Sequence, residues 1–190
     1  MAAFSSGFEA LDIGFWKRKK LMFYWQITKY DPQNRDADGV YLKDEWTGYG
    51  DIGRIFEGKV LTLEDYVKAE EMYIKAVLFF MKCLDIDTLK VISLEQYGKS
   101  PKSVTAEGVR IKNNTFYAKE KIAFIIKSIL RCKFWCMFES ENIRIRFDYN
   151  YYMRLACTMP CTSTIAQIEL LGLFVQESKR ELIFRDEEDE

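Results

Sequence analysis

A chain of 190 residues, 48% hydrophobic and 15% aromatic, is long enough to bury a substantial core in one domain. Its 28 basic and 29 acidic side chains leave a net charge of -1, and it contains no histidine. The lack of histidine excludes Ser-His and Cys-His nucleophiles as well as imidazole ligands and bases, so the composition favours binding over catalysis.

The first 21 residues differ in composition from the rest of the chain. They begin with small residues and end in a basic run at 17–20, so we expect a flexible N-terminal extension. The strand-like sequence begins at Met22. The alternative to a flexible extension is that the natural protein starts at this methionine. No charged segment precedes an apolar one as in a secretory signal, and no apolar run approaches the roughly 20 residues that span a bilayer. We therefore expect a cytoplasmic protein, with no membrane contact and with its five cysteines reduced.

The first half of the chain predicts two strands and a long helix. Residues 22–30 are rich in β-branched and aromatic residues and predict a strand, which Asp31-Pro32 ends. Residues 31–61 contain five glycines and predict a long irregular segment of the kind that is often functional. Thr62 caps a predicted helix that reaches about residue 84, and residues 89–95 predict a strand. The apolar stripe that should be buried on this helix comprises Leu63, Tyr66, Val67, Tyr73, Ile74, Val77, Leu78 and Met81.

The second half predicts a turn-rich connection at 97–105, a short strand at 108–112 and a helix at 118–131. A hairpin of strands 134–138 and 143–151 comes next, and the second strand alternates between apolar and polar residues. A third helix at 162–175 runs into an edge segment, and residues 185–190 form an acidic, solvated tail. The fold class is therefore α+β: a single domain over residues 22–184, with a mostly antiparallel sheet packed against about three helices.

Charge is distributed unevenly along the chain. Residues 31–71 hold 11 acidic and 5 basic side chains, whereas residues 99–154 hold 12 basic and 5 acidic ones. These blocks either pair on the surface or offer an acidic face to a basic partner. We expect no direct binding of nucleic acid, because the lysines and arginines of 119–133 are spaced as the solvated side of a helix.

Two cysteine pairs, Cys132 with Cys136 and Cys157 with Cys161, could supply four thiolates to a metal. Metal knuckles usually have two intervening residues rather than three, so we expect small buried side chains and no metal or cofactor. Paired carboxylates such as Asp44-Glu45 and Glu64-Asp65 leave open a small carboxylate- and metal-dependent hydrolase, although helix capping and solvation explain most of them. We assign no catalytic residues.

The stretch from Asp44 to Asp51 is the strongest candidate site. One interpretation is an ordered loop in which Trp46 and Tyr49 pack into the core while the carboxylates cap a turn. The other is a recognition loop, in which Trp46 and Tyr49 anchor a protein partner and Asp44, Glu45 and Asp51 form a charged rim.

Several short segments from Met22 onward resemble a family of small bacterial immunity proteins against polymorphic toxins, including those of contact-dependent growth inhibition. The chain differs from the family pattern at Asp148, where the family has glycine, and at Asn150, where it has aspartate. The matching segments are Trp25-Gln26-Ile27-Thr28-Lys29-Tyr30, residues 39–41, Asp44-Glu45-Trp46, Asp51-Ile52-Gly53, Leu130-Arg131, Trp135-Cys136, residues 147–153 and Gly172-Leu173-Phe174-Val175.

The resemblance implies a cytoplasmic inhibitor that binds the C-terminal domain of one cognate toxin and blocks its active site or substrate access. If that toxin is a nuclease with a basic surface, the acidic loop would complement it and speed encounter. The alternatives are the metal-dependent hydrolase and a general protein-interaction module.

Overall fold

The fold is known from a computed structural model, which describes residues 22–179. The expectations of a flexible extension at 1–21 and an acidic tail at 185–190 fall outside the described residues. The three helices are α1 (Leu63–Cys83), α2 (Lys119–Leu130) and α3 (Thr162–Leu170). The strands are β1 (Phe23–Thr28), β2 (Ile55–Phe56), β3 (Lys59–Val60), β4 (Thr88–Glu95), β5 (Ser103–Ala106), β6 (Val109–Lys112), β7 (Thr115–Ala118), β8 (Trp135–Glu139), β9 (Ile143–Asp148), β10 (Tyr152–Cys157) and β11 (Phe174–Glu177).

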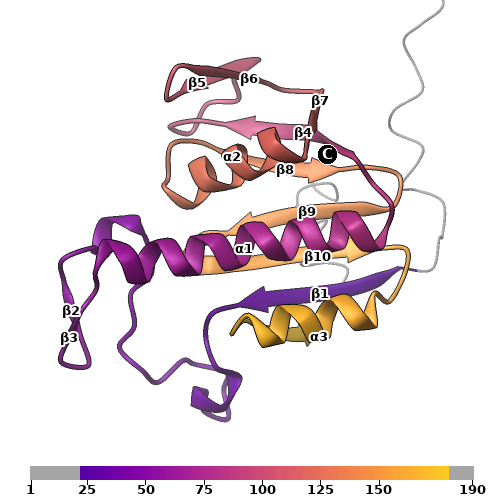
Figure 1. The fold of residues 1–190 in the computed structure, drawn as a ribbon. Coiled ribbons are helices and arrows are strands. Elements are labelled where there is room, and N and C mark those ends of the chain that lie inside the picture. The colour runs from indigo at the N-terminus through magenta and orange to yellow at the C-terminus, as the bar shows by residue number, and fades with distance from the viewer. Residues whose placement is uncertain (1–21, 180–190) are drawn as a thin grey trace, which may run out of the picture.

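Seven strands form one antiparallel sheet in the order β11-β1-β10-β9-β8-β4-β7. The helices lie side by side over one face of this sheet, with α1 between α2 and α3 (Figure 1). The hairpins β2–β3 and β5–β6 stand apart as two small sheets. The predicted α+β class, with an antiparallel sheet against three helices, is confirmed.

Helix α1 begins where its sequence predicts. The Thr62 hydroxyl accepts a hydrogen bond from the backbone N–H of Asp65 at 3.1 Å, and Glu64 and Asp65 place negative charge at the positive end of the helix dipole. Tyr66 and Tyr73 of the expected stripe are fully buried. Leu63, in contrast, has 54% of its surface exposed, because the first turn of α1 extends beyond the ends of the strands.

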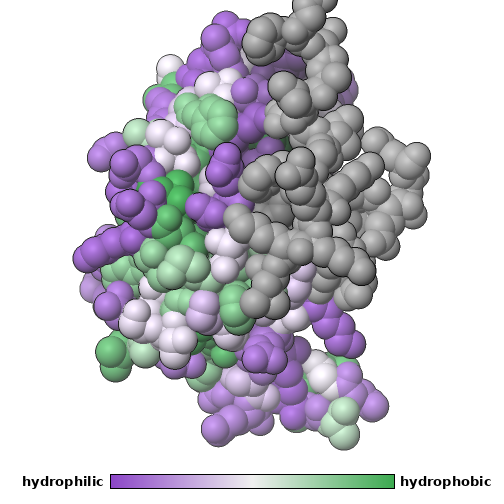
Figure 2. Space-filling model, turned by 90° about the vertical axis from the view of Figure 1, so that its right-hand side faces the viewer, coloured by the Kyte–Doolittle hydropathy of each residue, from purple (hydrophilic) through white to green (hydrophobic). Residues whose placement is uncertain are grey.

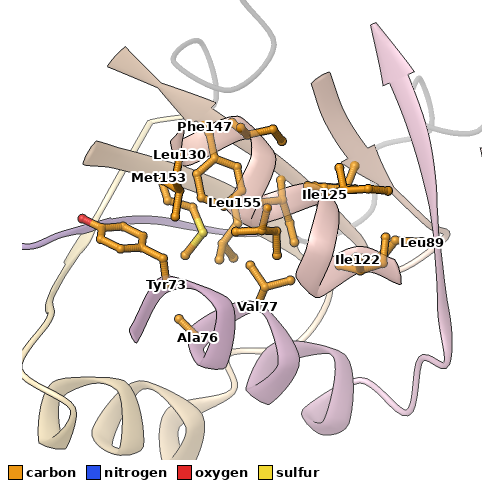
Figure 3. Packing of buried hydrophobic residues seen from close by; sticks show 14 of the residues in the cluster. Tyr73, Ala76, Val77, Leu89, Ile122, Ile125, Leu130, Phe147, Met153 and Leu155 are labelled. Carbon is orange, nitrogen blue, oxygen red and sulfur yellow. The ribbon is translucent and has the colours of Figure 1, made fainter. Parts of the chain in front are cut away.

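The core fills the layer between the helices and the sheet (Figure 3). Side chains of α1 and α2 meet residues of the central strands there, at close to zero exposure. At about 25 cal/mol per Å² of apolar area removed from water, this burial supplies the main stabilising free energy of the fold. The side chains that Figure 3 labels are Tyr73, Ala76, Val77, Leu89, Ile122, Ile125, Leu130, Phe147, Met153 and Leu155.

The predicted alternation of β9 holds only over residues 143–148. Ile143, Ile145 and Phe147 face the helices and are buried. The polar face is not simply solvated, since Arg144 is only 6% exposed. Instead, ion pairs run across four adjacent strands on that face: Glu139 lies 3.7 Å from Lys90 and 4.0 Å from Arg144, and Asp148 lies 2.8 Å from Arg146 and 2.6 Å from Arg154.

Beyond Asp148 the prediction of one strand to Tyr151 is wrong. Residues Tyr149–Tyr151 form a tight turn, and β10 returns antiparallel to β9 with Tyr152 opposite Asp148. Asn150 and Tyr151 both have positive φ, at 60° and 62°. The sequence continues to alternate through the turn, so periodicity alone did not reveal it. Strand β10 was therefore not separated from β9, and strands β2, β3, β5 and β7 were missed because each is short.

The cysteines differ from the expectation in two respects. Cys136 and Cys157 are buried thiols, as expected, whereas Cys132 is exposed, so the expectation of a buried side chain is wrong there. Cys83 and Cys161, in contrast, form a disulfide between the end of α1 and the residue before α3, so the expectation of five reduced thiols is wrong.

Figure 2 views the molecule from the right-hand side of Figure 1, the end at which α1 finishes. The described surface on this side mixes hydrophilic and hydrophobic residues.

Candidate functional site

The candidate site lies at the end of the molecule where α1 begins. Strand β1 finishes there, residues 31–62 wrap around the start of α1, and the turn between β9 and β10 and the end of α2 come together (Figure 1). Hydrogen bonds join these segments: the Tyr66 hydroxyl of α1 donates to the carbonyl of Leu130 at 3.0 Å. The Tyr30 hydroxyl donates to the carbonyl of Trp46 at 3.2 Å. We call this region, residues 29–62 with the side chains that they contact, the loop end.

Trp46 and Tyr49 are held by aromatic contacts inside the loop end. The Trp46 ring meets Tyr151 edge-on at 5.0 Å between centroids and lies 5.7 Å from Tyr66. The Tyr49 ring meets Tyr66 edge-on at 5.1 Å. Such pairs contribute roughly 0.5–1.5 kcal/mol each beyond their buried area. Both side chains are therefore half-buried supports of the loop.

The tyrosines beneath them form a buried network. The Tyr73 hydroxyl, in a fully buried side chain, donates to the carbonyl of Tyr151 and accepts the backbone N–H of Lys29 at 2.8 Å. The Tyr151 hydroxyl donates to that of Tyr66. Burial raises the pKa of all three phenols well above the ordinary value, so they stay protonated and can donate. These bonds hold Tyr151 in its positive-φ conformation, which is unfavourable for an aromatic residue.

Lys29 and Glu45 form an ion pair under the loop. The Lys29 side chain is 7% exposed, and its Nζ lies 3.0 Å from a Glu45 carboxylate oxygen. The same Nζ sits 3.9 Å from the centre of the Tyr30 ring and 4.1 Å from that of Trp46. Burial lowers the pKa of Lys29, and the hydrogen bond to Glu45 opposes that shift. The ammonium thus ties the loop to the end of β1.

Glu45 also accepts a hydrogen bond from the Tyr41 hydroxyl. Burial, reinforced by this bond and the adjacent carboxylate charge, raises the pKa of Tyr41 to about 12. Both oxygens of Glu45 are consequently engaged within the chain, one by Lys29 and one by Tyr41.

Asp51 closes a turn of the loop. One of its carboxylate oxygens accepts the backbone N–H groups of Thr47 at 2.8 Å and Gly48 at 3.1 Å, and the other accepts from Arg54 at 2.7 Å. Burial acts to raise the pKa of Asp51, but these hydrogen bonds outweigh it and hold the pKa below its ordinary value. Asp51 thus acts as a cap, the role that the first interpretation of this stretch gave to its carboxylates.

Of the five predicted binding residues, only Asp44 is exposed, and it takes no part in these contacts. Trp46, Tyr49, Glu45 and Asp51 are brought together and each has an intramolecular partner. The geometry therefore supports the ordered-loop interpretation for four of them. Their role in binding a partner stays a prediction.

Sequence reasoning missed the buried ion pair between Glu70 and Arg131, which lies next to the loop end. Glu70 is 3% exposed, and its carboxylate binds Arg131 through two hydrogen bonds of 2.6 and 2.9 Å, which join α1 to the end of α2. The Arg131 guanidinium lies 5.4 Å from the centre of the Tyr49 ring. Helical spacing is the sequence signal that could have revealed the burial of Glu70. This residue follows Tyr66 by four positions and precedes Tyr73 by three, so it lies on the buried face of α1.

The described part of the chain, residues 22–179, has no helix both long and apolar enough to cross a membrane. Within the same range, no group of three or more Asp, Glu or Cys side chains is arranged to hold a metal ion. Comparison of the chain with models of protein families, with curated proteins and with solved structures gives no match. The resemblance to immunity proteins therefore rests on the quoted segments alone.

Proposed function

We propose that this protein is an immunity protein that binds the C-terminal domain of a cognate bacterial toxin and blocks its active site or substrate access. The observation that carries the proposal is the ordered loop end. Residues 31–62 have little regular structure, yet aromatic rings and the Lys29–Glu45 ion pair fasten them to α1 and the sheet. A preorganised loop loses little conformational entropy on binding, which favours affinity.

The charge of the loop end supports a basic partner. Residues 36–64 hold seven acidic and three basic side chains. Of these acidic groups, Asp38, Asp44 and Glu57 are exposed and form no ion pair within the described residues. A nuclease binds phosphates through Lys and Arg, so exposed carboxylates would complement such a surface and accelerate association. We infer that the toxin is a nuclease.

A growth assay tests the proposal. The C-terminal domain of the protein encoded immediately upstream in the native operon is expressed with and without this chain. Rescue of growth, together with a one-to-one complex on gel filtration, is the expected result. Toxicity without rescue, or no complex between the purified proteins, would overturn it.

Asp44→Lys is the sharpest single substitution for this surface. Asp44 is exposed and has no partner in the described chain, so reversing its charge should weaken binding about tenfold without unfolding the protein. Glu45→Lys is a poor test, because it would place a second ammonium beside the buried Lys29 and disrupt the loop. A matched control is Glu71→Lys, an exposed carboxylate on α1 beyond the loop end.

An inhibitor of a toxin that acts inside the cell has to be in the cytoplasm. We therefore propose that this protein is cytoplasmic. Disulfides are rare there, so the Cys83–Cys161 bond provides a direct check. Cells are quenched with acid and the protein is alkylated under denaturing conditions, so that the buried thiols Cys136 and Cys157 react as well. Labelling of all five cysteines is expected if the protein resides in the cytoplasm and the Cys83–Cys161 bond is reduced there. Labelling of only Cys132, Cys136 and Cys157 would place it in an oxidising compartment.

The metal-dependent hydrolase is the second candidate, favoured only by the sequence pairs of carboxylates. An enzyme of that class would show a thermal shift with divalent metal and lose its activity with a chelator. Absence of both responses alongside rescue would leave the immunity function.

A further inference from the structure

The β2–β3 hairpin exposes two β-branched apolar side chains that are not part of the hydrophobic core. Ile55 is 64% exposed and Val60 is 47% exposed. The two residues lie directly opposite each other in the hairpin, so their side chains share one face. An isolated apolar residue on a surface is ordinary, but a cross-strand pair on a projecting hairpin forms a small contiguous apolar face.

The hairpin is firmly attached at its base. The backbone N–H of Leu61 donates to the carbonyl of Arg54 at 2.9 Å, and that of Gly53 donates to the carbonyl of Leu61 at 2.9 Å. Leu61 is only 5% exposed and fixes the base against the core. Beside the hairpin, the Lys59 ammonium lies 3.7 Å from the Asp65 carboxylate at the start of α1.

The turn at the tip preorganises the hairpin. Two residues, Glu57 and Gly58, connect the strands, and both have positive φ, at 47° and 79°. This is the geometry of a two-residue turn that matches the twist of a hairpin, and glycine adopts it readily. A two-stranded hairpin that buries little of its own surface is marginally stable alone, so its attachment and turn are what hold the apolar face outward.

Charge around this apolar face indicates the kind of partner. Arg54 pairs with Asp51 and Lys59 with Asp65, so the two basic side chains of the hairpin are neutralised within the chain. Glu57 at the tip is exposed and forms no ion pair within the described residues, and the loop end has an acidic excess. Glu57 and the two ion pairs together hold three carboxylates and two cations, so a small acidic excess of one charge accompanies the two apolar side chains.

We propose that the β2–β3 hairpin is the contact element of the loop end, and that Ile55 and Val60 enter an apolar depression bordered by basic side chains on a protein partner. The inference rests on the proposed function, in which that partner is the toxin domain. It assigns the contact to residues outside the Asp44 to Asp51 stretch, whose aromatic side chains are engaged within the chain.

The test compares three full-length variants for binding to the purified C-terminal domain of the upstream-encoded protein by surface plasmon resonance, which gives both the affinity and the association rate. The double variant Ile55→Ser/Val60→Ser should weaken binding at least about tenfold, because contacts at the centre of an interface dominate affinity. Glu57→Lys should weaken it less and mainly slow association. The control Met159→Ser, a 49% exposed methionine beyond β10 at the other end of the molecule, should leave affinity unchanged.

The outcomes separate the two proposals. Wild-type affinity in the folded double variant, as verified by circular dichroism, would overturn the hairpin inference while leaving the immunity function standing. Failure of the wild-type chain to bind the upstream-encoded domain would overturn both. An equal loss of affinity in Met159→Ser would also overturn the inference, because the effect would then not be specific to the hairpin.

Discussion

Two neighbouring parts of the loop end differ in where their side chains lie: residues 29–51 hold a half-buried aromatic pair besides the exposed Val40 and Leu42, and the β2–β3 hairpin holds an exposed aliphatic pair. In the first, Trp46 and Tyr49 turn inward onto Tyr66. In the second, Ile55 and Val60 turn outward. A large aromatic side chain in an irregular loop can thus fix the loop, whereas smaller apolar side chains nearby remain exposed.

The two segments differ in how many regular backbone hydrogen bonds hold them in place. Residues 29–51 have few backbone hydrogen bonds of regular structure, so side-chain contacts must offset the entropy cost of ordering them. The hairpin has its own ladder and turn, and needs no side chains for that purpose. Substitution of the inward-facing aromatic side chains should therefore reduce stability, whereas substitution of the exposed aliphatic pair of the hairpin should reduce binding.

The largest expected loss of stability is that of Glu70→Ala. It leaves Arg131 without its carboxylate, and because the Arg131 side chain is only 17% exposed, we expect a loss of about 3 kcal/mol. Urea unfolding measures it. The matched control is the adjacent Glu71→Ala. The Glu71 side chain is 57% exposed and pairs with the exposed Lys75, so we expect a loss of less than about 0.5 kcal/mol. Similar losses in both variants would contradict the assigned role of the buried pair.

A smaller loss is expected for Trp46→Ala, about 2 kcal/mol, because its half-buried ring contacts Tyr66, Tyr151 and Lys29. Chemical denaturation gives the value, and limited proteolysis should show faster cleavage within residues 31–62. Tyr97→Ala is the control, since Tyr97 is 89% exposed and should be neutral. A neutral Trp46→Ala would mean that the ring does not fasten the loop.

Asp51→Asn should cost about 1 kcal/mol at pH 7, because the amide replaces a charged acceptor of three N–H groups. The pKa of Asp51 is lowered in the folded state, so its contribution is present above the unfolded pKa, near 4, and is lost as the pH falls through the folded value. The difference between wild type and variant should therefore shrink below about pH 4 in urea titrations. A difference that persists undiminished at the acid end of the titration would contradict this account.

The smallest effect on stability is expected for Ile55→Ser/Val60→Ser, within about 0.5 kcal/mol, since both side chains are largely exposed. Thermal unfolding checks it. A loss near that of Trp46→Ala would show that the hairpin's apolar face supports the fold, and the comparison between the two segments would fail.

Much of the fold could be predicted from local patterns. The spacing of apolar residues placed α1 and α2 within a residue or two of their observed limits. Strand β10 could not be separated from β9, because alternation continues through Tyr149 and Tyr151 while the chain reverses at Asn150. This turn has positive φ at Asn150 and Tyr151, and a glycine there would have indicated it more clearly.

The candidate site was less predictable. The stretch from Asp44 to Asp51 was located, but which way each side chain points depends on contacts with residues far along the chain, such as Lys29, Tyr66 and Tyr151. Glu70 was missed because a carboxylate on a helix is usually solvated, and only its partner Arg131, 61 residues later, offsets the cost of burying it. The hairpin was hidden in a glycine-rich segment without a strand pattern.

Composition and periodicity were enough to predict the α+β class, the capped start of α1, the amphipathic α2 and the absence of histidine chemistry, because these signals act over a few neighbouring residues. The tertiary structure alone decided which residues of the loop end face inward. Burial, ion pairing and ring contacts join positions separated by tens of residues, and a half-buried aromatic residue has the same local pattern whether it fixes a loop or binds a partner.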